Sequence, residues 1–395
     1  MMGESKKNVP KRRFKEFENA KAWEQHKLGN LADIVRGASP RPIQDPKWFD
    51  DKSIVGWLRI SDVSDQDGRI HYLEQHISKA GQGKTRVLMQ SHLLLSIAAS
   101  VGKPVINYIS TGVHDGFLIF QNPTFDREFM FQWMKMFEGQ WQKYGQPGSQ
   151  VNLNSDIVKN QVIIIPKEKE QIKIGTFFFD LDNLITLHQR KLEKIKALKK
   201  AYLTEMFPAE GERKPKLRFA GFTDDWKQRK VKEVCSISTG KSNTQDHIDD
   251  GIYPFYVRSA IIEHSNRYLY DEEAVLTVGD GVGTGKVFHY VNGKYDLHQR
   301  VYRMFGFING ISGKYFYYYF SNHFYDRVMS MTAKTSVDSV RFEMISEMDI
   351  MLPTEKEQTV ITGFFDILDN LIAFHERKLE KLQNIKKAYL NEMFI

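Results

Sequence analysis

The chain has 395 residues and a mass of 46.1 kDa, and this length predicts two or three domains of about 100–200 residues each. Its hydrophobic fraction of 41% and aromatic fraction of 13% exclude a wholly disordered protein, and its one cysteine, Cys235, excludes a disulfide scaffold. The formal net charge of +7 favours a polyanionic partner. Because no apolar run is long enough for a membrane span or a signal peptide, we expect a cytoplasmic protein.

The first half of the chain is predicted to contain a basic arm, a domain of mixed α/β structure and a long helix. Within the domain, residues 57–61 and 93–97 have the apolar composition of strands, and residues 126–137 have the spacing of an amphipathic helix. The predicted boundaries are 1–22 for the arm, 23–166 for the domain and 167–207 for the helix.

The second half repeats this order after a linker rich in proline, glycine and charge. Residues 255–259 and 274–278 are predicted strands, and residues 314–328 are a predicted helix whose aromatic stripe belongs in the core. The predicted boundaries are 208–218 for the linker, 219–353 for the second domain and 354–395 for the final helix.

The two long helices are near copies of each other. Residues 181–207 read LDNLITLHQRKLEKIKALKKAYLTEMF, and residues 368–394 read LDNLIAFHERKLEKLQNIKKAYLNEMF, so the copies are 187 positions apart without a gap. The match extends back to Pro166 and Pro353, each of which is followed closely by the run Glu-Lys-Glu-Gln. Because the domains between the helices differ strongly, the chain is an internal repeat of a shared helix and a variable domain.

Each shared segment has the pattern of an amphipathic helix, with apolar residues at steps of three or four. A helix of about 39 residues spans roughly 58 Å and needs a partner along its length. The nearest partner is the other copy, which predicts an antiparallel coiled coil that relates the two halves by a pseudo-two-fold axis. The alternative is that each helix packs only on its own domain.

No catalytic motif in the sequence is complete. The glycine-rich run 279–286 is not a Walker A phosphate loop, because Asp280 and Val287 stand where that loop requires Gly and Ser or Thr. One cysteine and scattered histidines do not make a zinc site, and His188 and His375, at equivalent helix positions, are expected to be buried structural residues. We therefore expect no active site, metal or cofactor in this chain.

The repeat itself points to a type of function. Two near-identical helices offer two copies of one surface, so a partner protein that binds one copy should bind the other as well. Two different domains on a common spacer would read two different targets. Duplex DNA has a two-fold relation between its strands, so a pseudo-symmetric chain with unlike halves predicts a two-part, asymmetric DNA site.

With this repeat, the chain resembles the specificity subunit of type I restriction–modification systems over nearly its full length. The resemblance rests on the Pro-x-Glu-Lys-Glu-Gln turns and on the repeated LDNLI-x-x-His-x-Arg-Lys-Leu-Glu-Lys helices. It implies an α+β fold with two mixed α/β target-recognition domains, each reading one half of a bipartite sequence in double-stranded DNA. It also implies two methylation subunits that use S-adenosylmethionine, and two restriction subunits that use ATP and Mg²⁺.

Polar residues near the predicted strand ends are the candidate DNA contacts. Arginine is the commonest reader of bases, whereas Lys, Ser and Thr more often contact phosphates. Arg59 and Arg258 follow similar strands, and His114 and His298 precede similar strands. Residues shared by readers of different sequences favour contacts to the backbone or a role in the fold. The candidates are Arg59, Ser61, Ser100, Lys103, His114, Ser149, Gln150, Asn152, Arg258, Ser259, Thr284, Lys286, His298, Gln299, Arg300, Lys334, Thr335 and Ser336.

The shared helices supply the candidates for coiled-coil and partner contacts. Pairing of the two helices requires only that their apolar positions match, so the repetition of the polar positions as well favours a shared partner. The candidates are Leu181, Leu184, His188, Arg190, Lys191, Leu192, Lys194, Leu368, Leu371, His375, Arg377, Lys378, Leu379 and Lys381.

From the residues alone, two other interpretations stay open. One is a stand-alone DNA-binding enzyme, such as a nuclease, with an unrecognised active site. The other is a coiled-coil scaffold or a mimic of nucleic acid, although a mimic should be strongly acidic and this chain carries a net charge of +7.

Overall fold

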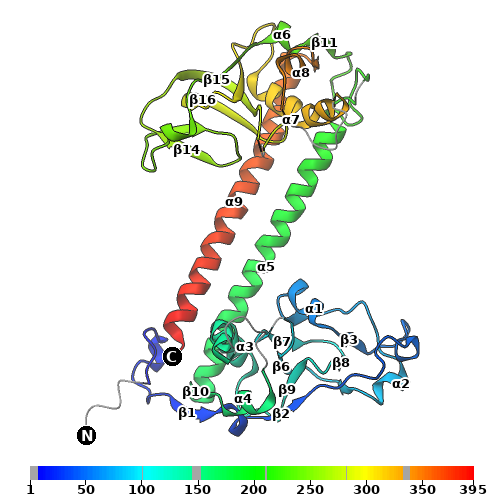
Figure 1. Ribbon diagram of the computed structural model, residues 1–395, viewed down its shortest axis with the longest axis vertical. Coiled ribbons are helices and arrows are strands. Elements are labelled where there is room, and N and C mark those ends of the chain that lie inside the picture. The colour runs from blue at the N-terminus through cyan, green and yellow to red at the C-terminus, as the bar shows by residue number, and fades with distance from the viewer. Residues whose placement is uncertain (1–7, 100, 145–152, 210, 282, 332–338) are drawn as a thin grey trace. The chain divides into compact units, whose positions relative to one another are not determined.

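A computed structural model of the chain describes residues 8–99, 101–144, 153–209, 211–281, 283–331 and 339–395. Its contacts divide the chain into two compact units, and many of their elements are labelled in Figure 1. The first unit comprises Met1–Gln189 and Arg377–Ile395, and the second comprises Arg190–Glu376. Each unit therefore contains one variable domain and a segment of each long helix. The boundaries predicted for the target-recognition domains stay a prediction.

The described residues of the first unit form a five-stranded sheet in the order β2-β9-β6-β7-β4, a three-stranded sheet in the order β3-β8-β5, and the pair β1-β10. The strands are β1 (Glu24–Lys27), β2 (Asp33–Arg36), β3 (Gly56–Leu58), β4 (Arg69–Ile70), β5 (Arg86–Leu88), β6 (Leu93–Ser96), β7 (Pro104–Asn107), β8 (Thr111–Val113), β9 (Phe117–Gln121) and β10 (Val162–Ile165). The helices are α1 (Ile60–Asp65), α2 (Lys79–Gln82), α3 (Arg127–Phe137), α4 (Ser155–Asn160) and α5 (Glu168–Glu205), with short 3-10 helices η1 (Lys15–Phe17), η2 (Leu28–Asn30), η3 (Pro46–Trp48) and η4 (Glu138–Tyr144).

In the second unit, the described strands form a six-stranded sheet in the order β12-β17-β15-β16-β13-β14 and the pair β11-β18. The strands are β11 (Lys227–Lys230), β12 (Ser236–Thr239), β13 (Tyr253–Tyr256), β14 (Ile262–Ser265), β15 (Tyr270–Val278), β16 (Phe288–Leu297), β17 (Val301–Phe305) and β18 (Asp349–Leu352). The helices are α6 (Val231–Val234), α7 (Gly313–Ser330), α8 (Phe342–Ser346) and α9 (Glu355–Met393), with the 3-10 helix η5 (Thr244–Asp246).

The two variable domains share part of their topology despite their different sequences. The order β2-β9-β6 in the first unit corresponds to β12-β17-β15 in the second. Each unit also has a parallel pair, with Leu58 of β3 opposite Val113 of β8 in the three-stranded sheet and Tyr256 of β13 opposite Leu297 of β16 in the six-stranded sheet. The mixed α/β fold predicted for both domains is thereby confirmed, and the registers supply a common frame for comparing them.

Aromatic helices cover the core of each domain. The predicted helices at 126–137 and 314–328 are α3 and α7, and α3 buries Phe129 and Trp133 against Ile174 and Phe178 of α5. The aromatic stripe of α7 is buried as predicted, since its ring residues Phe316, Tyr318, Tyr319 and Phe320 lie in the core of the second unit. Their burial removes large apolar areas from water, which is the main stabilising contribution of these helices.

The long helices run antiparallel in both units, as predicted. In the first unit, Phe177 and Asp182 of α5 contact Tyr389 and Lys386 of α9, respectively, so residue numbers rise along α5 in the direction in which they fall along α9. In the second unit, the same order is followed by the contacts Lys196–Glu376, Lys199–Asp369 and Tyr202–Phe364. These contacts exclude the alternative that each helix packs only on its own domain.

The helix contacts are reciprocal under the 187-residue repeat. The Lys386–Asp182 ion pair of the first unit has its counterpart in Lys199–Asp369 of the second, in which the two helices exchange roles. The residues just beyond the end of each helix are exchanged in the same way, because Phe394 stacks on Phe178 in one core and Phe207 stacks on Phe365 in the other. This exchange gives the pseudo-two-fold repeat a structural basis.

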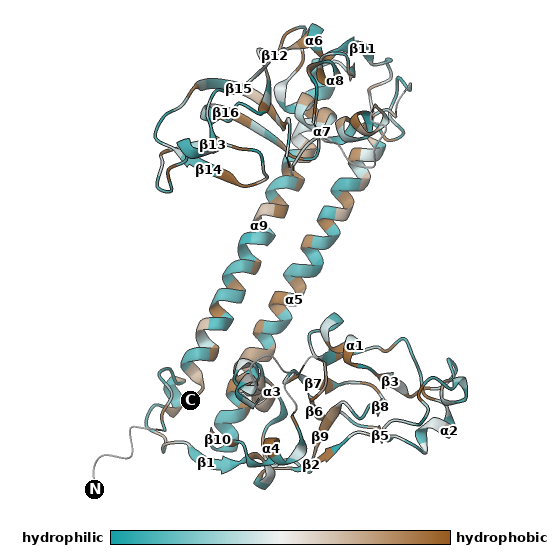
Figure 2. Cartoon of the chain, in the orientation of Figure 1, coloured by the Kyte–Doolittle hydropathy of each residue, from teal (hydrophilic) through white to brown (hydrophobic). Residues whose placement is uncertain are grey.

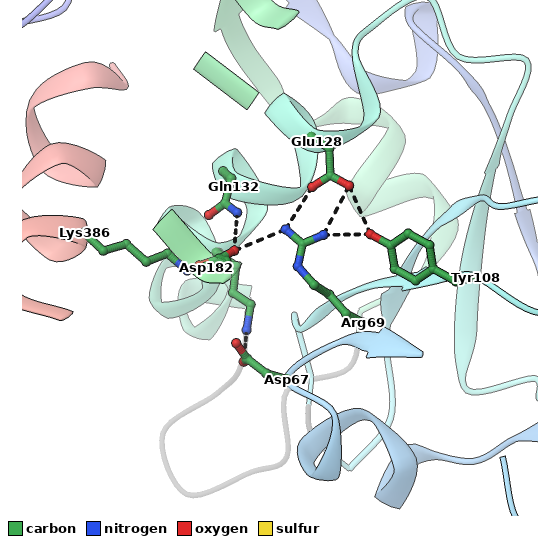
Figure 3. A network of polar contacts seen from close by, with 8 residues as sticks. Asp67, Arg69, Tyr108, Glu128, Gln132, Asp182 and Lys386 are labelled. Carbon is green, nitrogen blue, oxygen red and sulfur yellow. Dashed lines mark hydrogen bonds and ion pairs between the residues drawn. The ribbon is translucent and has the colours of Figure 1, made fainter. Parts of the chain in front are cut away.

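A buried polar network connects the first domain to both helices (Figure 3). Arg69 of β4 lies 2.8 Å from Glu128 of α3 and 3.2 Å from Asp182 of α5. Asp182 also accepts a hydrogen bond from Gln132 at 2.8 Å and pairs with Lys386 at 2.6 Å. Because each charge in this network has a partner, the domain is held to the helices without leaving an uncompensated buried charge.

A second pair of contacts holds the N-terminal end of each helix. Glu170 pairs with Arg13 through two hydrogen bonds of 2.6 Å, and Glu357 pairs with Arg218 at 2.7 and 2.8 Å. The spacing of Thr354 and Glu357 is that of a capping box, but only half of it forms. The Glu357 N–H donates to the Thr354 hydroxyl at 3.3 Å, whereas the Glu357 carboxylate binds Arg218.

No helix in the described part of the chain combines the length and apolar composition that a membrane crossing requires. Among the same residues, no group of three or more His, Cys, Asp and Glu side chains is placed to hold a metal ion. Cys235 is buried, and its burial raises the pKa of the thiol to about 12, which agrees with a place in the core.

Candidate nucleic-acid interface

A tight turn that begins at a histidine follows the parallel strand pair in each domain. We call residues His114–Phe117 and His298–Val301 the histidine turns. In each turn the N–H of the fourth residue donates to the histidine carbonyl oxygen, at 3.2 Å for Phe117 and 3.0 Å for Val301. The turns connect β8 to β9 and β16 to β17, so they occupy the same place in the shared topology.

Further backbone hydrogen bonds confirm that the histidine turns are equivalent. Gly37 donates to Phe117 at 2.8 Å, and Gly240 donates to Val301 at 3.2 Å. A Cβ atom on either glycine would collide with a carbonyl oxygen at the start of the turn, so this close approach requires glycine. The residue that follows the neighbouring strand also binds the turn. The N–H of Ile97, after β6, donates to the Gly116 carbonyl oxygen, and the N–H of Gly279, after β15, donates to the Arg300 carbonyl oxygen, both at 2.8 Å.

Both turn histidines are held in one tautomer. The N–H of Gly116 donates to Nδ1 of His114 at 2.9 Å, and the N–H of Arg300 donates to Nδ1 of His298 at 3.0 Å. Since a backbone N–H can only donate, each Nδ1 must accept, and the ring proton is assigned to Nε2. Burial lowers the pKa of both imidazoles and favours the same neutral form. The nearby Asp115 opposes this shift at His114, but burial outweighs it.

In the first unit, an open pocket of about 550 Å³ lies beside the histidine turn. The Arg59 guanidinium is oriented there by Asp62, whose carboxylate accepts from Nη2 at 2.9 Å and from the Arg59 backbone N–H at 2.8 Å. The pocket thus combines apolar and aromatic walls with side chains that can donate or accept hydrogen bonds to a base edge. Its lining residues are Ile43, Gln44, Pro46, Phe49, Trp57, Arg59, Ile60, Gln75 and His114.

Arginines gather at the tip of the first histidine turn. The Asp115 carboxylate accepts from Arg41 Nη2 at 2.7 Å and from the Ser39 hydroxyl at 2.8 Å. Arg36 Nε donates to the Asp115 carbonyl oxygen at 2.6 Å. The Arg41 side chain is 73% exposed, so most of its guanidinium faces solvent while one end is held. The sequence prediction missed Arg36, Arg41 and Asp115, although basic residues on both sides of Gly37 were a usable signal.

The second histidine turn also carries arginines around a carboxylate. Asp280 lies between Arg258, whose Nη1 is 3.5 Å away, and Arg300, whose Nε is 3.7 Å away. Gln299 donates to the side-chain oxygen of Asn243, which ties the tip of the turn to η5. The structure therefore brings three predicted residues, Arg258, Gln299 and Arg300, to one surface, together with the unpredicted Asp280 and Asn243.

The registers correct one predicted equivalence. Leu58 and Tyr256 hold matching positions opposite the residues that precede the two turn histidines. Arg59 therefore corresponds to Val257, and Arg258 lies one residue further along the chain. The two arginines are not equivalent, because similar residue types in a short strand do not fix its register against a neighbour.

Other predicted contacts have local partners in the structure. The Thr284 hydroxyl donates to the Gly281 carbonyl at 2.6 Å in a buried turn, and the Ser259 hydroxyl accepts from the Ile261 N–H at 3.3 Å. Lys103 donates to Ser64 at 3.4 Å, and Lys286 lies 4.8 Å from the centre of the Tyr325 ring. Ser61 is exposed in α1. Outside the described residues lie the candidates Ser100, Ser149, Gln150, Asn152, Lys334, Thr335 and Ser336.

The candidates on the long helices separate into buried and exposed sets. Leu181, Leu192, Leu368 and His375 are buried, and His188 and Leu379 are partly buried, so these residues belong to the packing of the helices. Leu184 is 47% exposed and Leu371 is 41% exposed, although both are apolar. Hydrophilic residues make up much of both long helices (Figure 2), and the cationic candidates on them are exposed. The exposed charged candidates are Arg190, Lys191, Lys194, Arg377, Lys378 and Lys381.

The exposed apolar residues repeat along with the helices. Leu187 and Phe374, each three residues beyond Leu184 and Leu371, are also exposed. We call Leu184 with Leu187, and Leu371 with Phe374, the helix patches. An open groove of about 520 Å³ lies further along α9, lined by Arg377, Glu380, Lys381, Asn384, Ile385 and Ala388. Apolar side chains that water can reach in two matching places are typical of a surface that binds a protein.

Comparisons with known proteins place the chain in a family. The family model of the type I restriction modification DNA specificity domain matches residues 20–197 and again residues 223–384. The specificity subunit of the type I restriction enzyme EcoDI of Escherichia coli is 26% identical over 165 residues, which cover 42% of this chain and 36% of that protein. The MjaVIII specificity subunit of Methanocaldococcus jannaschii is 22% identical over 297 residues, which cover 69% of this chain and 70% of that one.

A solved structure has the same fold. The type I restriction–modification S subunit from M. genitalium superposes with a TM-score of 0.70 and 12% sequence identity, over 98% of this chain and 99% of that one. The fold predicted from the repeat is thus confirmed over nearly the whole chain. With two matches to one family model, one on each variable domain, the chain belongs to the family of type I restriction modification DNA specificity domains.

Proposed function

We propose that this chain is the DNA-recognition subunit of a type I restriction–modification complex and that it reads an asymmetric two-part sequence in double-stranded DNA. The observation that carries the proposal is a single turn framework that occurs twice, with different polar residues at its tip. Two readers that share a framework and differ in their exposed side chains suit two half-sites of different sequence. The relatives named as specificity subunits support the same function.

The chain's contribution is binding and positioning, and catalysis belongs to other subunits. Methylation subunits would supply S-adenosylmethionine chemistry on adenine, and restriction subunits would supply the ATP- and Mg²⁺-dependent steps. Membership of a family defined by DNA specificity favours this division over a stand-alone nuclease. Exposed arginines at both histidine turns fit binding to a polyanion, since neutralising phosphates releases counterions and stabilises the complex.

The helix patches are the proposed docking sites for two methylation subunits, through which two restriction subunits join. Each patch has two exposed apolar residues and lies among cations that the 187-residue repeat preserves. Burying the patches on a partner would remove their apolar surface from water. Because the two patches are near copies, one type of partner can occupy both.

Long-read mapping of methylated bases tests the recognition function. Cells that express the chain with the methylation subunits of its own system should carry methylated adenines in one asymmetric two-part sequence. Binding of the purified complex to that sequence should weaken steeply as salt rises. Absence of sequence-selective methylation would contradict the proposal, and cleavage of DNA by the chain alone with Mg²⁺ would favour the nuclease.

Native mass spectrometry tests the docking sites. Leu184→Glu should remove one methylation subunit from the complex, Leu371→Glu should remove the other, and the double variant should bind none. Ile54→Glu and Ile252→Glu are matched controls, because they place the same charge on exposed apolar residues away from the long helices. Two bound subunits in the double variant would exclude the helix patches as the docking sites.

A further inference from the structure

Each histidine turn has a part that is common to both domains and a part that differs between them. What these parts imply about base reading rests on the proposed function. The shared part is the framework: the glycine beneath the turn, the histidine, and the backbone hydrogen bonds described above. The part that differs is the tip, which is Asp115-Gly116 in the first unit and Gln299-Arg300 in the second. Two readers of different base sequences must differ where they contact bases, so the tip is the place to look for specificity.

One arrangement occurs at both tips with its parts exchanged. In the second unit, the tip supplies the arginine, Arg300, and the loop after β15 supplies the carboxylate, Asp280. In the first unit, the tip supplies the carboxylate, Asp115, and the loop after β2 supplies the arginine, Arg41. The side chains of Arg41 and Arg300 are 73% and 64% exposed, so each keeps N–H donors available beyond its contact with the carboxylate.

A carboxylate beside an exposed arginine favours base reading over phosphate binding. It offsets the positive charge that attracts phosphate, and where it accepts a hydrogen bond, as Asp115 does from Arg41 at 2.7 Å, it also limits the orientations of the guanidinium. A planar fork held in one orientation can donate two parallel hydrogen bonds to O6 and N7 of guanine in the major groove. A phosphate contact requires charge but not that geometry, so the carboxylates would serve no purpose there.

We infer that Arg41 and Arg300 are specificity-determining residues, each reading a guanine in a different half of the DNA site. Asp115 is the positioning residue of Arg41, and Asp280 lies beside Arg300 and offsets its charge. This inference assigns one guanine position to each histidine turn.

Four substitutions test the inference in the complex with methylation subunits. Arg300→Ala and Arg300→Lys should each relax the preference for guanine at one position of one half-site, by about five- to 150-fold, because a bidentate pair discriminates by roughly 1–3 kcal/mol. Arg41→Ala and Arg41→Lys should do the same at one position of the other half-site. Lysine keeps the charge but lacks the fork, so it should restore overall binding and not the preference.

The matched control is Arg229→Ala, which removes an exposed arginine of the second unit that lies on β11 rather than at a turn. It should leave every position of the recognised sequence unchanged. Thermal unfolding midpoints equal to that of the parent protein establish that each variant is folded.

Two kinds of result would overturn the inference. One is an Arg300→Ala variant that binds all sequences more weakly by the same factor, with lysine restoring the parent behaviour, because that is the signature of a phosphate contact. The other is a variant of either arginine that reads the parent sequence unchanged. Both results leave the proposed function intact, whereas the proposed function fails only if the parent complex itself lacks sequence selectivity.

Discussion

Ion pairs between arginine and glutamate secure the N-terminal ends of the long helices at the residue scale. Arg13 and Glu170 are almost fully buried, and Trp23 donates a further hydrogen bond to Glu170 at 3.3 Å. A buried pair of this kind contributes little over an apolar pair of the same shape, but removing one member leaves a charge without compensation. Substitution of either Arg13 or Glu170 alone is therefore expected to lower the stability of the fold.

Replacing Glu170 with alanine should lower the free energy of unfolding by roughly 3–5 kcal/mol, because the buried Arg13 guanidinium loses its counter-charge. Urea denaturation monitored by tryptophan fluorescence measures this change. Glu392→Ala is the matched control, since its pairing with Arg12 is exposed and screened by water. Equal losses in the two variants would show that burial does not decide the energetics of these pairs.

The turn histidines give the protein a pH-dependent stability. Burial lowers the pKa of His114 and His298 below that of an unfolded histidine, so between the two pKa values the unfolded state binds more protons. The stability that they contribute is complete above the unfolded pKa of about 6.5 and is lost as the pH falls toward the folded pKa. Protonation also breaks the hydrogen bond that each Nδ1 accepts.

Urea titrations between pH 7.5 and 5.5 should therefore show the free energy of unfolding falling with pH. The double variant His114→Asn, His298→Asn should show a shallower fall, because an asparagine oxygen can accept the same hydrogen bond without titrating. A residual slope is expected from His289, whose pKa burial also lowers. An unchanged slope in the double variant would exclude the turn histidines as its source.

At the scale of elements, close approach of helices depends on single small residues. Gly175 of α5 faces the N-terminal end of α3, where an added Cβ would lie 2.6 Å from Asp126 Oδ1 and 2.7 Å from the Phe129 nitrogen. Both atoms belong to the hydrogen bond that caps the N-terminal end of α3, in which the Phe129 N–H donates to Asp126 Oδ1 at 2.8 Å. By contrast, among the described residues outside the adjoining turns of α9, no atom lies within 4 Å of the place where a Cβ on Gly363 would stand.

Gly175→Ala should lower the free energy of unfolding by about 1–3 kcal/mol, because α5 must move away from the end of α3. Gly363→Ala should raise it by up to about 1 kcal/mol, because alanine is the better helix former and meets no obstacle. The same urea denaturation measures both effects, and each variant is the other's control. Opposite signs are the expected outcome; two stabilised variants would contradict the close packing at Gly175.

At the scale of the whole molecule, the repeat makes the chain modular. Each unit has its own core and its own histidine turn. The core of the first unit includes Met393 and Phe394 at the C-terminal end of α9, and that of the second includes Met206 and Phe207, which follow α5. Changes confined to one variable domain should therefore act on one half of the recognised DNA sequence.

Replacing residues 23–166 with the corresponding domain of a relative should change one half of the methylated sequence and leave the other half intact. The physical reason is that the second core and its histidine turn contain no residue from this segment. Long-read mapping of methylated bases measures both halves in one experiment. Simultaneous changes in both halves would contradict the modular arrangement.

Lengthening both long helices by seven residues at repeat-related positions should lengthen the gap between the half-sites. Two helical turns add about 10.5 Å at 1.5 Å per residue, which is roughly three base pairs, and they keep the apolar faces aligned. The same methylation mapping should show unchanged bases on both sides of a longer gap. A gap of the original length would show that the helices do not set the spacing.

The sequence alone determined the features that depend on local periodicity and on repetition. The 187-residue repeat identified both long helices and their pairing, and the spacing of aromatic residues identified α3 and α7. These features were predictable because the spacing of apolar residues along one helix face is a local property of the sequence. Periodicity did not decide which candidates for coiled-coil and partner contacts are buried, since Leu184 and Leu371 are exposed in the structure.

The tertiary structure alone decided which polar residues meet. Arg41 and Asp115 are 74 positions apart in the chain, and nothing in either local sequence joins them. The one-residue shift between Arg59 and Arg258 became visible only in the registers of β3 against β8 and of β13 against β16. Strand register and turn contacts are set by pairing between distant segments. The fold could therefore be predicted from the sequence, whereas the arrangement of side chains at the histidine turns is visible only in the tertiary structure.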